Sequence, residues 1–234
     1  MRLLYGSTIA LAIAMLIPAM GAAQGMDASR AIKGGGISVS GWHGHVDARA
    51  KQHGMTYKDD KLTGTPEKLH VRTGPAVVYW NPSNKASGDY TVKAKFTEPK
   101  FMNLNSHPHP YGIFIAGKNM GTSNETLLYC EAYGDGRFIV RGFGPEAFEM
   151  NGRRGESNSA VHKAAGVDKP VSQEIAMSVK GNTVSCSING TVVASYPKSE
   201  VVTSGKLQSL DGVYGIRFAH NTEGYVTGLK KTNE

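Results

Sequence analysis

A short glycine-containing turn between two alternating segments constrains the fold of this chain more than any other stretch. Residues 127–133 and 137–143 alternate between apolar and polar side chains, and residues 134–136 (Gly-Asp-Gly) separate them. A two-residue turn would place a carboxylate among the apolar side chains. A three-residue turn with one glycine in the left-handed conformation instead pairs Cys130 with Val140. The sequence therefore predicts an antiparallel hairpin in this second register.

The two faces of the predicted hairpin differ in chemistry. One face is small and apolar, which is typical of a core. The other face is aromatic and charged, as expected of a ligand-binding surface or of a solvated sheet face. Its side chains are those of Tyr129, Glu131, Tyr133, Arg137, Ile139 and Arg141.

The N-terminus has the composition of a secretory signal peptide, which we expect to cover residues 1–23. A basic start precedes an apolar run over residues 3–17, and Gly21 and Ala23 match a small-x-small cleavage site. The mature chain is then expected to begin at Gln24. Because the apolar run is too short to predict a membrane span, we expect a periplasmic or extracellular protein.

The rest of the chain predicts one all-β domain. Residues 24–36 are small, polar and glycine-rich, which predicts a flexible N-terminal arm. Residues 89–98 alternate strictly, and residues 171–196 contain two further turn signals between apolar rows. No convincing amphipathic helix follows the arm. We therefore predict a single antiparallel two-sheet β-sandwich, of the jelly-roll type, over residues 37–234.

The formal charge of +7 is spread along the chain and is not gathered in one basic block. This distribution favours anionic surroundings without indicating nucleic acid. Acidic polysaccharide and envelope lipid fit it equally well. We expect a glycan as the partner, no nucleic acid and no membrane span after removal of the signal peptide.

The chain has two cysteines, Cys130 and Cys186, and both are predicted to point into the core. In an oxidising compartment they could form a disulfide, whereas two buried free thiols would satisfy the same pattern. Their spacing indicates neither a metal site nor a catalytic thiol.

Glu131 is the candidate catalytic residue. It lies between Tyr129 and Tyr133, with Arg137 and Arg141 as diagonal neighbours on the next strand. Aromatic rings that stack on sugars, flanked by groups that hydrogen-bond hydroxyls, are typical of a glycan site. The alternative is a common cross-strand pair between a glutamate and an arginine on a solvated face.

Glycoside hydrolysis needs two carboxyl groups, roughly 5–9 Å apart, on either side of the bond. Asp135 lies in the predicted turn, and Glu146 and Glu149 lie in a predicted loop, so Glu131 has no partner carboxylate on its own strand face. Enzymatic activity, as a glycoside hydrolase, therefore stays an alternative to binding alone.

Two His-x-His pairs, His43 with His45 and His107 with His109, could each chelate a metal such as zinc. Neither pair has a recognisable third and fourth ligand, so the sequence assigns no metal and no cofactor. We retain His107, His109 and Trp80 as candidate ligand-binding residues beside the hairpin face. The alternative for the tryptophans is burial, and we favour a core position for at least one of Trp42 and Trp80.

Six short segments, each a strand or a turn, carry a resemblance through the order in which they follow one another. They are 73–79 (TGPAVVY), 88–92 (GDYTV), 111–115 (YGIFI), 134–138 (GDGRF), 184–190 (VSCSING) and 211–216 (DGVYGI). In this order the chain resembles the concanavalin A-like lectin/glucanase superfamily, and within it the secreted bacterial domains called 3-keto-disaccharide hydrolase. The resemblance implies a jelly roll with a concave face and a role that involves glycans. The Glu-x-Asp-x-x-Glu motif of laminarinase-like glucanases has no match here, so the resemblance supplies no catalytic residues.

These observations lead to one main functional hypothesis and two alternatives. The main hypothesis is a secreted carbohydrate-active domain that binds glycan on the face of Glu131, with loops 99–110 and 144–169 at its rims. A glycoside hydrolase of the 3-keto-disaccharide type is the second. A structural or interaction domain of the cell envelope is the third.

Overall fold

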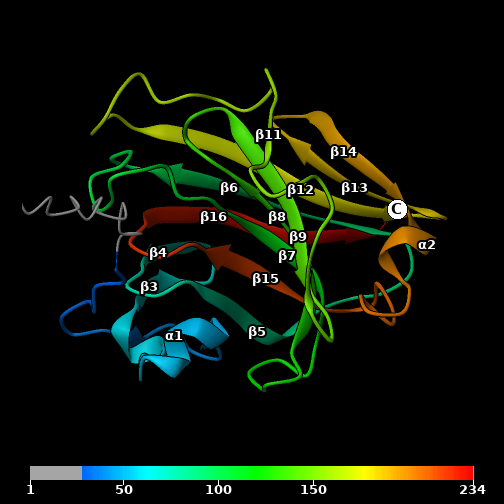
Figure 1. Ribbon diagram of the computed structural model, residues 1–234, viewed down its shortest axis with the longest axis horizontal. Helices are drawn as coiled ribbons and strands as arrows, with labels where there is room; N and C mark the ends of the chain where they lie inside the picture. Colours follow the sequence, from blue (N-terminus) through cyan, green and yellow to red (C-terminus); the bar gives the residue numbers. More distant parts are fainter. Residues whose placement is uncertain (1–27, 234) are drawn as a thin grey trace, which may run out of the picture.

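The computed structural model describes residues 28–233 as two β-sheets packed face to face (Figure 1). The predicted signal peptide, residues 1–23, and the start of the predicted arm lie outside the described residues. Sheet 1 has eight strands, which are, in spatial order, β1 (Gly36–Ile37), β3 (Lys61–Thr65), β4 (Lys68–Arg72), β16 (Glu223–Asn233), β6 (Tyr90–Glu98), β12 (Val171–Lys180), β13 (Thr183–Ile188) and β14 (Thr191–Pro197).

Sheet 2 forms the second layer. Its strands are, in spatial order, β10 (Ala147–Glu149), β9 (Arg137–Phe143), β8 (Thr126–Ala132), β7 (Tyr111–Lys118), β15 (Gly212–Phe218), β5 (Val77–Ala86) and β2 (His43–Val46), and β11 (Glu156–Ser157) also pairs with β9. The helical segments are short: α1 (Ala48–Gln52), a 3-10 turn (Tyr57–Asp59) and α2 (Lys198–Val201). The prediction of an all-β, antiparallel two-sheet sandwich is confirmed, with the short β1–β3 pair as a parallel exception.

The predicted register of the hairpin around residues 134–136 is also confirmed. In the β8–β9 hairpin Cys130 lies opposite Val140, and Gly136 has a φ of 95°, in the left-handed region that the three-residue turn requires. In the β12–β13 hairpin Val179 lies opposite Val184. Because these registers fix which side chains point inward, the two apolar rows meet in the core between the sheets.

The core is closed by a covalent bond between the sheets. Cys130 of β8 forms a disulfide with Cys186 of β13, with the two Cα atoms 6.2 Å apart. Both cysteines are fully buried among side chains of the two inner faces. Of the two arrangements compatible with the sequence, the structure therefore has the disulfide.

A second apolar cluster covers part of the outer face of sheet 2, on the side away from the core. It consists of Val78, Trp80, Phe114, Leu127, Tyr129 and Ile139, all of which are buried. The face that the sequence marks as aromatic and charged is therefore partly packed. Its open part lies toward one end of the sheet.

The described part of the N-terminal arm contacts the domain. The backbone N–H of Arg30 donates to the side-chain oxygen of Asn221, whose amide donates to the carbonyl of Ala28. Further along, Gly36 and Ile37 form β1 beside β3. These contacts place residues 28–30 next to the turn between β15 and β16.

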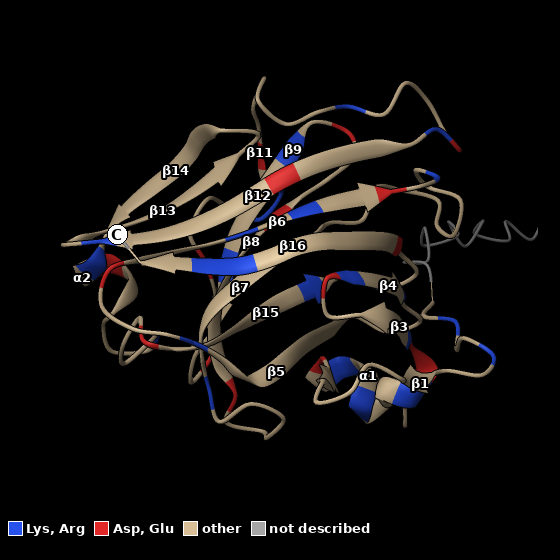
Figure 2. Cartoon of the chain, turned by 180° about the vertical axis from the view of Figure 1, so that it is seen from behind, with Lys and Arg blue, Asp and Glu red and all other residues tan. Residues whose placement is uncertain are grey.

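Figure 2 views the molecule from the side of sheet 1, where basic and acidic side chains are dispersed over the strands, with one short basic band on β16. None of the helices within residues 28–233 has the length and apolarity needed to span a bilayer.

Candidate functional site

A row of three residues crosses the middle of sheet 2. Glu131 of β8 lies opposite Gly112 of β7, which in turn lies opposite Arg217 of β15. Cross-strand partners point to the same face, so Glu131 and Arg217 both project outward. Because Gly112 has no side chain, Arg217 Nη1 comes within 3.7 Å of Glu131 Oε1 across β7.

Arg217 is the centre of this site. Its Nη2 donates to Asp47 Oδ2 at 2.7 Å, and Asp47 directly follows β2. The guanidinium carbon lies 4.7 Å from the centre of the Tyr129 ring and 5.4 Å from that of Phe143. These are cation–π distances, and the Arg217 side chain is only 8% exposed. We call Asp47, Glu131, Arg217 and Tyr129 the arginine cluster.

Burial dominates the electrostatics of the arginine cluster. It raises the pKa of Glu131 to about 7, against the lowering effect of Arg217. It also raises the pKa of Asp47, again opposed by Arg217. For Arg217, burial acts to lower the pKa. The attraction of the Asp47 and Glu131 carboxylates acts in the opposite direction and is larger in sum, so the pKa of Arg217 is raised. A cationic centre therefore lies beside a carboxyl group that titrates near neutral pH.

Three polar atoms of this cluster make no hydrogen bond to any of residues 28–233. They are Glu131 Oε1 and Arg217 Nε and Nη1, and each is buried. A buried polar atom without a partner costs on the order of 1–3 kcal/mol. Such atoms are a feature of sites that exchange protein contacts for ligand or water contacts.

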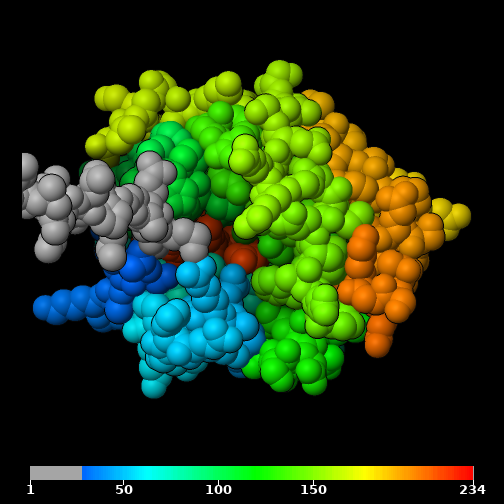
Figure 3. Space-filling view, in the orientation of Figure 1, coloured from blue at the N-terminus to red at the C-terminus, as the bar shows by residue number. Residues whose placement is uncertain are grey.

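A cavity of about 580 Å³ opens beside the arginine cluster, and Figure 3 shows the hollow between the blue-cyan segment around α1 and the yellow-green segment after β9. Asp47, 29% exposed, belongs both to the cavity wall and to the arginine cluster. Other residues of its wall are Arg49, His53, Met55, Ala76 and His220.

Three of the residues predicted from sequence are more enclosed than a binding surface requires. Glu131 is 1% exposed, Tyr129 is 5% exposed and Trp80 is 6% exposed. Trp80 and Tyr129 pack in the outer apolar cluster. The structure therefore brings Tyr129 and Glu131 together at Arg217, whereas Trp80 lies on β5, separated from Tyr129 on β8 by the two strands β7 and β15, inside the packed part of the face.

The two arginines of β9 lie diagonal to Glu131, as predicted, but they have other partners. Arg137 pairs with Asp135 at 2.7 Å and lies over the Tyr133 ring at 4.7 Å. Arg141 pairs with Glu149 of β10 at 3.4 Å. The alternative of a cross-strand ion pair between Glu131 and an arginine of β9 is therefore not formed, and the carboxylate lies near Arg217, across Gly112.

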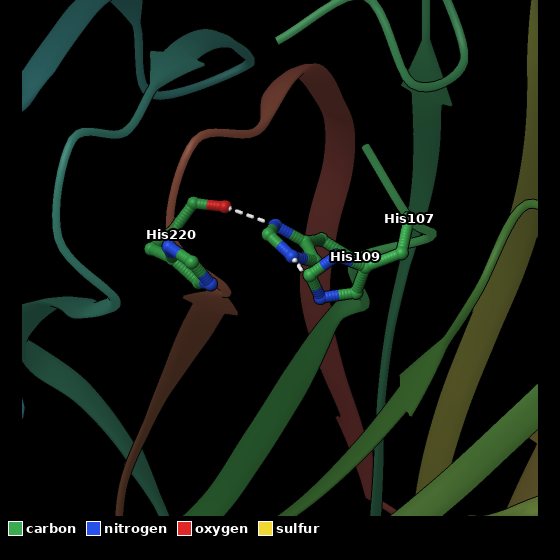
Figure 4. A group of neighbouring side chains, drawn as sticks. All are labelled: His107, His109 and His220. Carbon is green, nitrogen blue, oxygen red and sulfur yellow. Dashed lines mark hydrogen bonds between the residues drawn. The ribbon is translucent and has the colours of Figure 1, made fainter. Parts of the chain in front are cut away.

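His107 and His109 lie at the end of sheet 2 where β7 begins. Their Nε2 atoms are 2.9 Å apart, and the ring of His220 lies 4.1 Å from that of His109, centre to centre (Figure 4). One ligand atom from each of the three lies within 4.8 Å of the others. The other His-x-His pair, His43 and His45, belongs to no comparable group of three ligand residues within residues 28–233. His45 contacts Glu125, and His43 stacks on Trp80.

Sequence reasoning missed three residues of the site: Asp47, Arg217 and His220. Arg217 had one visible signal, since it is the only charged residue in the strand Gly212–Phe218. Asp47 and His220 lie just beyond strand ends, where periodicity carries no information. Their position depends on the order of strands in sheet 2, which places β15 between β7 and β5.

Comparison with known proteins supports the fold and supplies no closer relationship. No protein-family model and no curated protein match the chain. Among solved structures, the carbohydrate-binding module CBM66 from Bacillus subtilis is similar over 85% of this chain and 100% of its own, with a TM-score of 0.54 and 10% identity. A Bacillus subtilis protein of unknown function with a galectin-like fold is similar over 82% of this chain and 89% of its own, with a TM-score of 0.49 and 13% identity.

Sheep galectin-11 is also similar, over 63% of this chain and 93% of its own, with a TM-score of 0.41 and 13% identity. The first of these likenesses shows the fold class: the chain is a β-sandwich with the architecture of a carbohydrate-binding module. At 10% identity the likeness shows the fold alone. The narrower resemblance to 3-keto-disaccharide hydrolases has no counterpart among these matches.

Proposed function

We propose that the protein is a secreted carbohydrate-binding protein whose glycan site is the hollow on the outer face of sheet 2, beside the arginine cluster. The observation that carries the proposal is the set of buried polar atoms on Glu131 and Arg217 that make no hydrogen bond to residues 28–233, next to a cavity that Asp47 lines. A guanidinium and two carboxyl groups supply the donors and acceptors that sugar hydroxyls need.

The aromatic element of the site is Tyr133. It follows β8 at the sheet end where β15 also ends, since Ala132 pairs with Tyr111 and Tyr111 pairs with Phe218. Unlike Tyr129 it is only half-buried, and Arg137 lies over its ring. An accessible tyrosine beside hydrogen-bonding groups can stack on a sugar ring while those groups bind hydroxyls.

The fold adds support of a general kind. The similar solved structure with a TM-score of 0.54 is a carbohydrate-binding module, although likeness at 10% identity transfers no ligand. The proposal therefore rests on the arginine cluster and the cavity, and the fold makes a glycan the first ligand class to test.

The test is a glycan array on the mature chain, followed by calorimetry on the best ligand. Asp47→Asn and Tyr133→Ala are expected to weaken binding at least about tenfold, the equivalent of one lost stacking or charge-assisted contact. Tyr225→Ala is the matched control, because Tyr225 is a half-buried tyrosine that stacks on His70 on sheet 1. Equal losses in all three variants, or no glycan bound at all, would overturn the proposal in favour of a structural or interaction domain.

A glycoside hydrolase, including one for 3-keto-disaccharides, is the second candidate. The observation that favours it is that Asp47 and Glu131 contact the same guanidinium, which places their carboxyl groups within about 9 Å of each other, inside the range of glycosidases. The raised pKa of Glu131, about 7, suits a general acid. Product release that Glu131→Gln abolishes while glycan binding persists would establish this activity, whereas binding without turnover in the wild type would exclude it.

A further inference from the structure

The histidine cluster, formed by His107, His109 and His220, is a second constellation with its own chemistry. The sequence shows one His-x-His pair here, and the fold adds the third imidazole (Figure 4). We propose that the histidine cluster binds one divalent transition-metal ion of the zinc class. Three imidazoles with a remaining open position are a common ligand set for such ions.

The distances between ligand atoms suit this proposal. Two nitrogen ligands of a tetrahedral zinc ion lie about 3.3 Å apart, given zinc–nitrogen bonds of about 2.0–2.1 Å. The Nε2 atoms of His107 and His109 are 2.9 Å apart, and the third ligand atom lies within 4.8 Å of both. The separations are therefore close to those of three imidazoles around one ion.

The tautomer of His109 is also set for metal binding. Its Nδ1 lies within hydrogen-bond distance of the backbone carbonyl oxygen of His220. A carbonyl only accepts, so Nδ1 carries the proton and Nε2 keeps its lone pair. It is Nε2 that faces His107. In metal-binding histidines, the ring nitrogen that does not bind the metal commonly donates to a backbone carbonyl, which fixes the orientation of the ring.

The backbone presents the histidine cluster rigidly. Pro108 and Pro110 restrict His107 and His109 to extended conformations, so their side chains lie on one side of the segment. The backbone N–H of Ala219 donates to the carbonyl of Pro110 at 3.0 Å, which continues the β7–β15 pairing and delivers His220 beside His109. Ligands separated by more than 100 residues are thus positioned by sheet pairing.

The turn that carries His220 is anchored as well. Asn221 has a φ of 48° and is buried, and its side-chain amide contacts Ala28 and Arg30. Its carbonyl accepts from the side chain of Asn105, in the same loop as His107. A site held on both sides by such contacts loses little conformational entropy when the ion binds.

The position of the ion would connect the two sites. His220 lines the cavity beside Asp47, so open coordination positions of the ion would face the same hollow. Coordination of a sugar oxygen there rests on the proposed glycan function. Metal binding itself does not, because it needs only the three imidazoles.

The experiment uses the mature chain, purified without a histidine tag and depleted of metal with a chelator. Zn²⁺ is titrated by calorimetry, and Co²⁺ is titrated by visible absorption, which reports the coordination geometry. We expect one ion per chain. His107→Gln and His220→Gln are each expected to weaken Zn²⁺ binding by at least about 100-fold, since loss of a ligand exceeds the 10–100-fold effect of an outer-shell partner.

His43→Gln is the matched control, because His43 is an exposed member of the other His-x-His pair. It should bind Zn²⁺ like the wild type. His107 is exposed, so its replacement tests the site without removing core packing. Absence of a one-to-one complex, or an equal loss in His43→Gln and His107→Gln, would overturn the metal site. A chain that binds Zn²⁺ but no glycan would keep the metal site and reject the proposed function.

Discussion

Reduction of the disulfide between Cys130 and Cys186 should destabilise the protein by an amount that its place in the chain predicts. The bond joins residues 56 apart in sequence and links the two sheets. In the unfolded chain it closes a loop of that length, which corresponds to about 4 kcal/mol of lost conformational entropy at 25 °C. With a urea m-value of about 2–3 kcal/mol/M, the unfolding midpoint should fall by roughly 1.5–2 M.

The assay compares urea unfolding of the oxidised chain with that of chain reduced while unfolded and then refolded in reductant. Thiol titration must show two free thiols in the reduced sample. The double variant Cys130→Ala/Cys186→Ala is the control, because its midpoint should not respond to reductant. A reduced wild-type chain that unfolds at the oxidised midpoint would refute the loop-closure argument and assign the stability of this fold to core packing alone.

Two further predictions concern stability. Burial raises the pKa of Glu131 to about 7 and of Asp60 to about 8, so folding favours their protonated forms. This stability is complete below about pH 4 and is lost progressively as the pH rises from there to the folded pKa values, by roughly 3 kcal/mol for Glu131. Unfolding curves from pH 5 to 8.5 should show this decline, and Glu131→Gln should reduce it; a flat profile would contradict it. Gly112→Ala should lower the free energy of unfolding in urea by about 3 kcal/mol or more, because the added Cβ would overlap the backbone of β8. Gly166→Ala is the control: an added Cβ there has no neighbour nearer than 4.0 Å, so the free energy of unfolding should change by less than about 0.5 kcal/mol.

The parts of the fold that the sequence predicts are those with local causes. The Gly-Asp-Gly turn and the alternation around Cys130 fix the β8–β9 register, because a slip by one residue would turn the whole apolar row to solvent. The inward direction of Cys130 and Cys186 follows from the same alternation, and the structure joins them. A local pattern is therefore enough to predict strands, turns and faces.

The candidate site could be predicted only in part, because its geometry depends on sheet order. Glu131 and His109 are recognisable from their local context, but their partners come from β15 and the turn after it: Arg217 and His220 lie about 90 and 110 positions later in the chain. No local pattern predicts that β15 inserts between β7 and β5. Burial of at least one tryptophan follows from its apolar character, but the packing of Trp80 in the outer apolar cluster does not, since that cluster draws on several strands.

The link between Cys130 and Cys186 also changes what a protease can achieve. Strands β9, β10, β11 and β12 and the long polar segment after β9 all lie within the stretch that the bond encloses. A single cut anywhere in that stretch opens the backbone but leaves both fragments covalently joined, and the strand pairings of the two fragments persist. For the secreted location that we propose, where disulfides endure, a protease that cuts in the exposed stretch 152–154 would leave the sandwich in one piece.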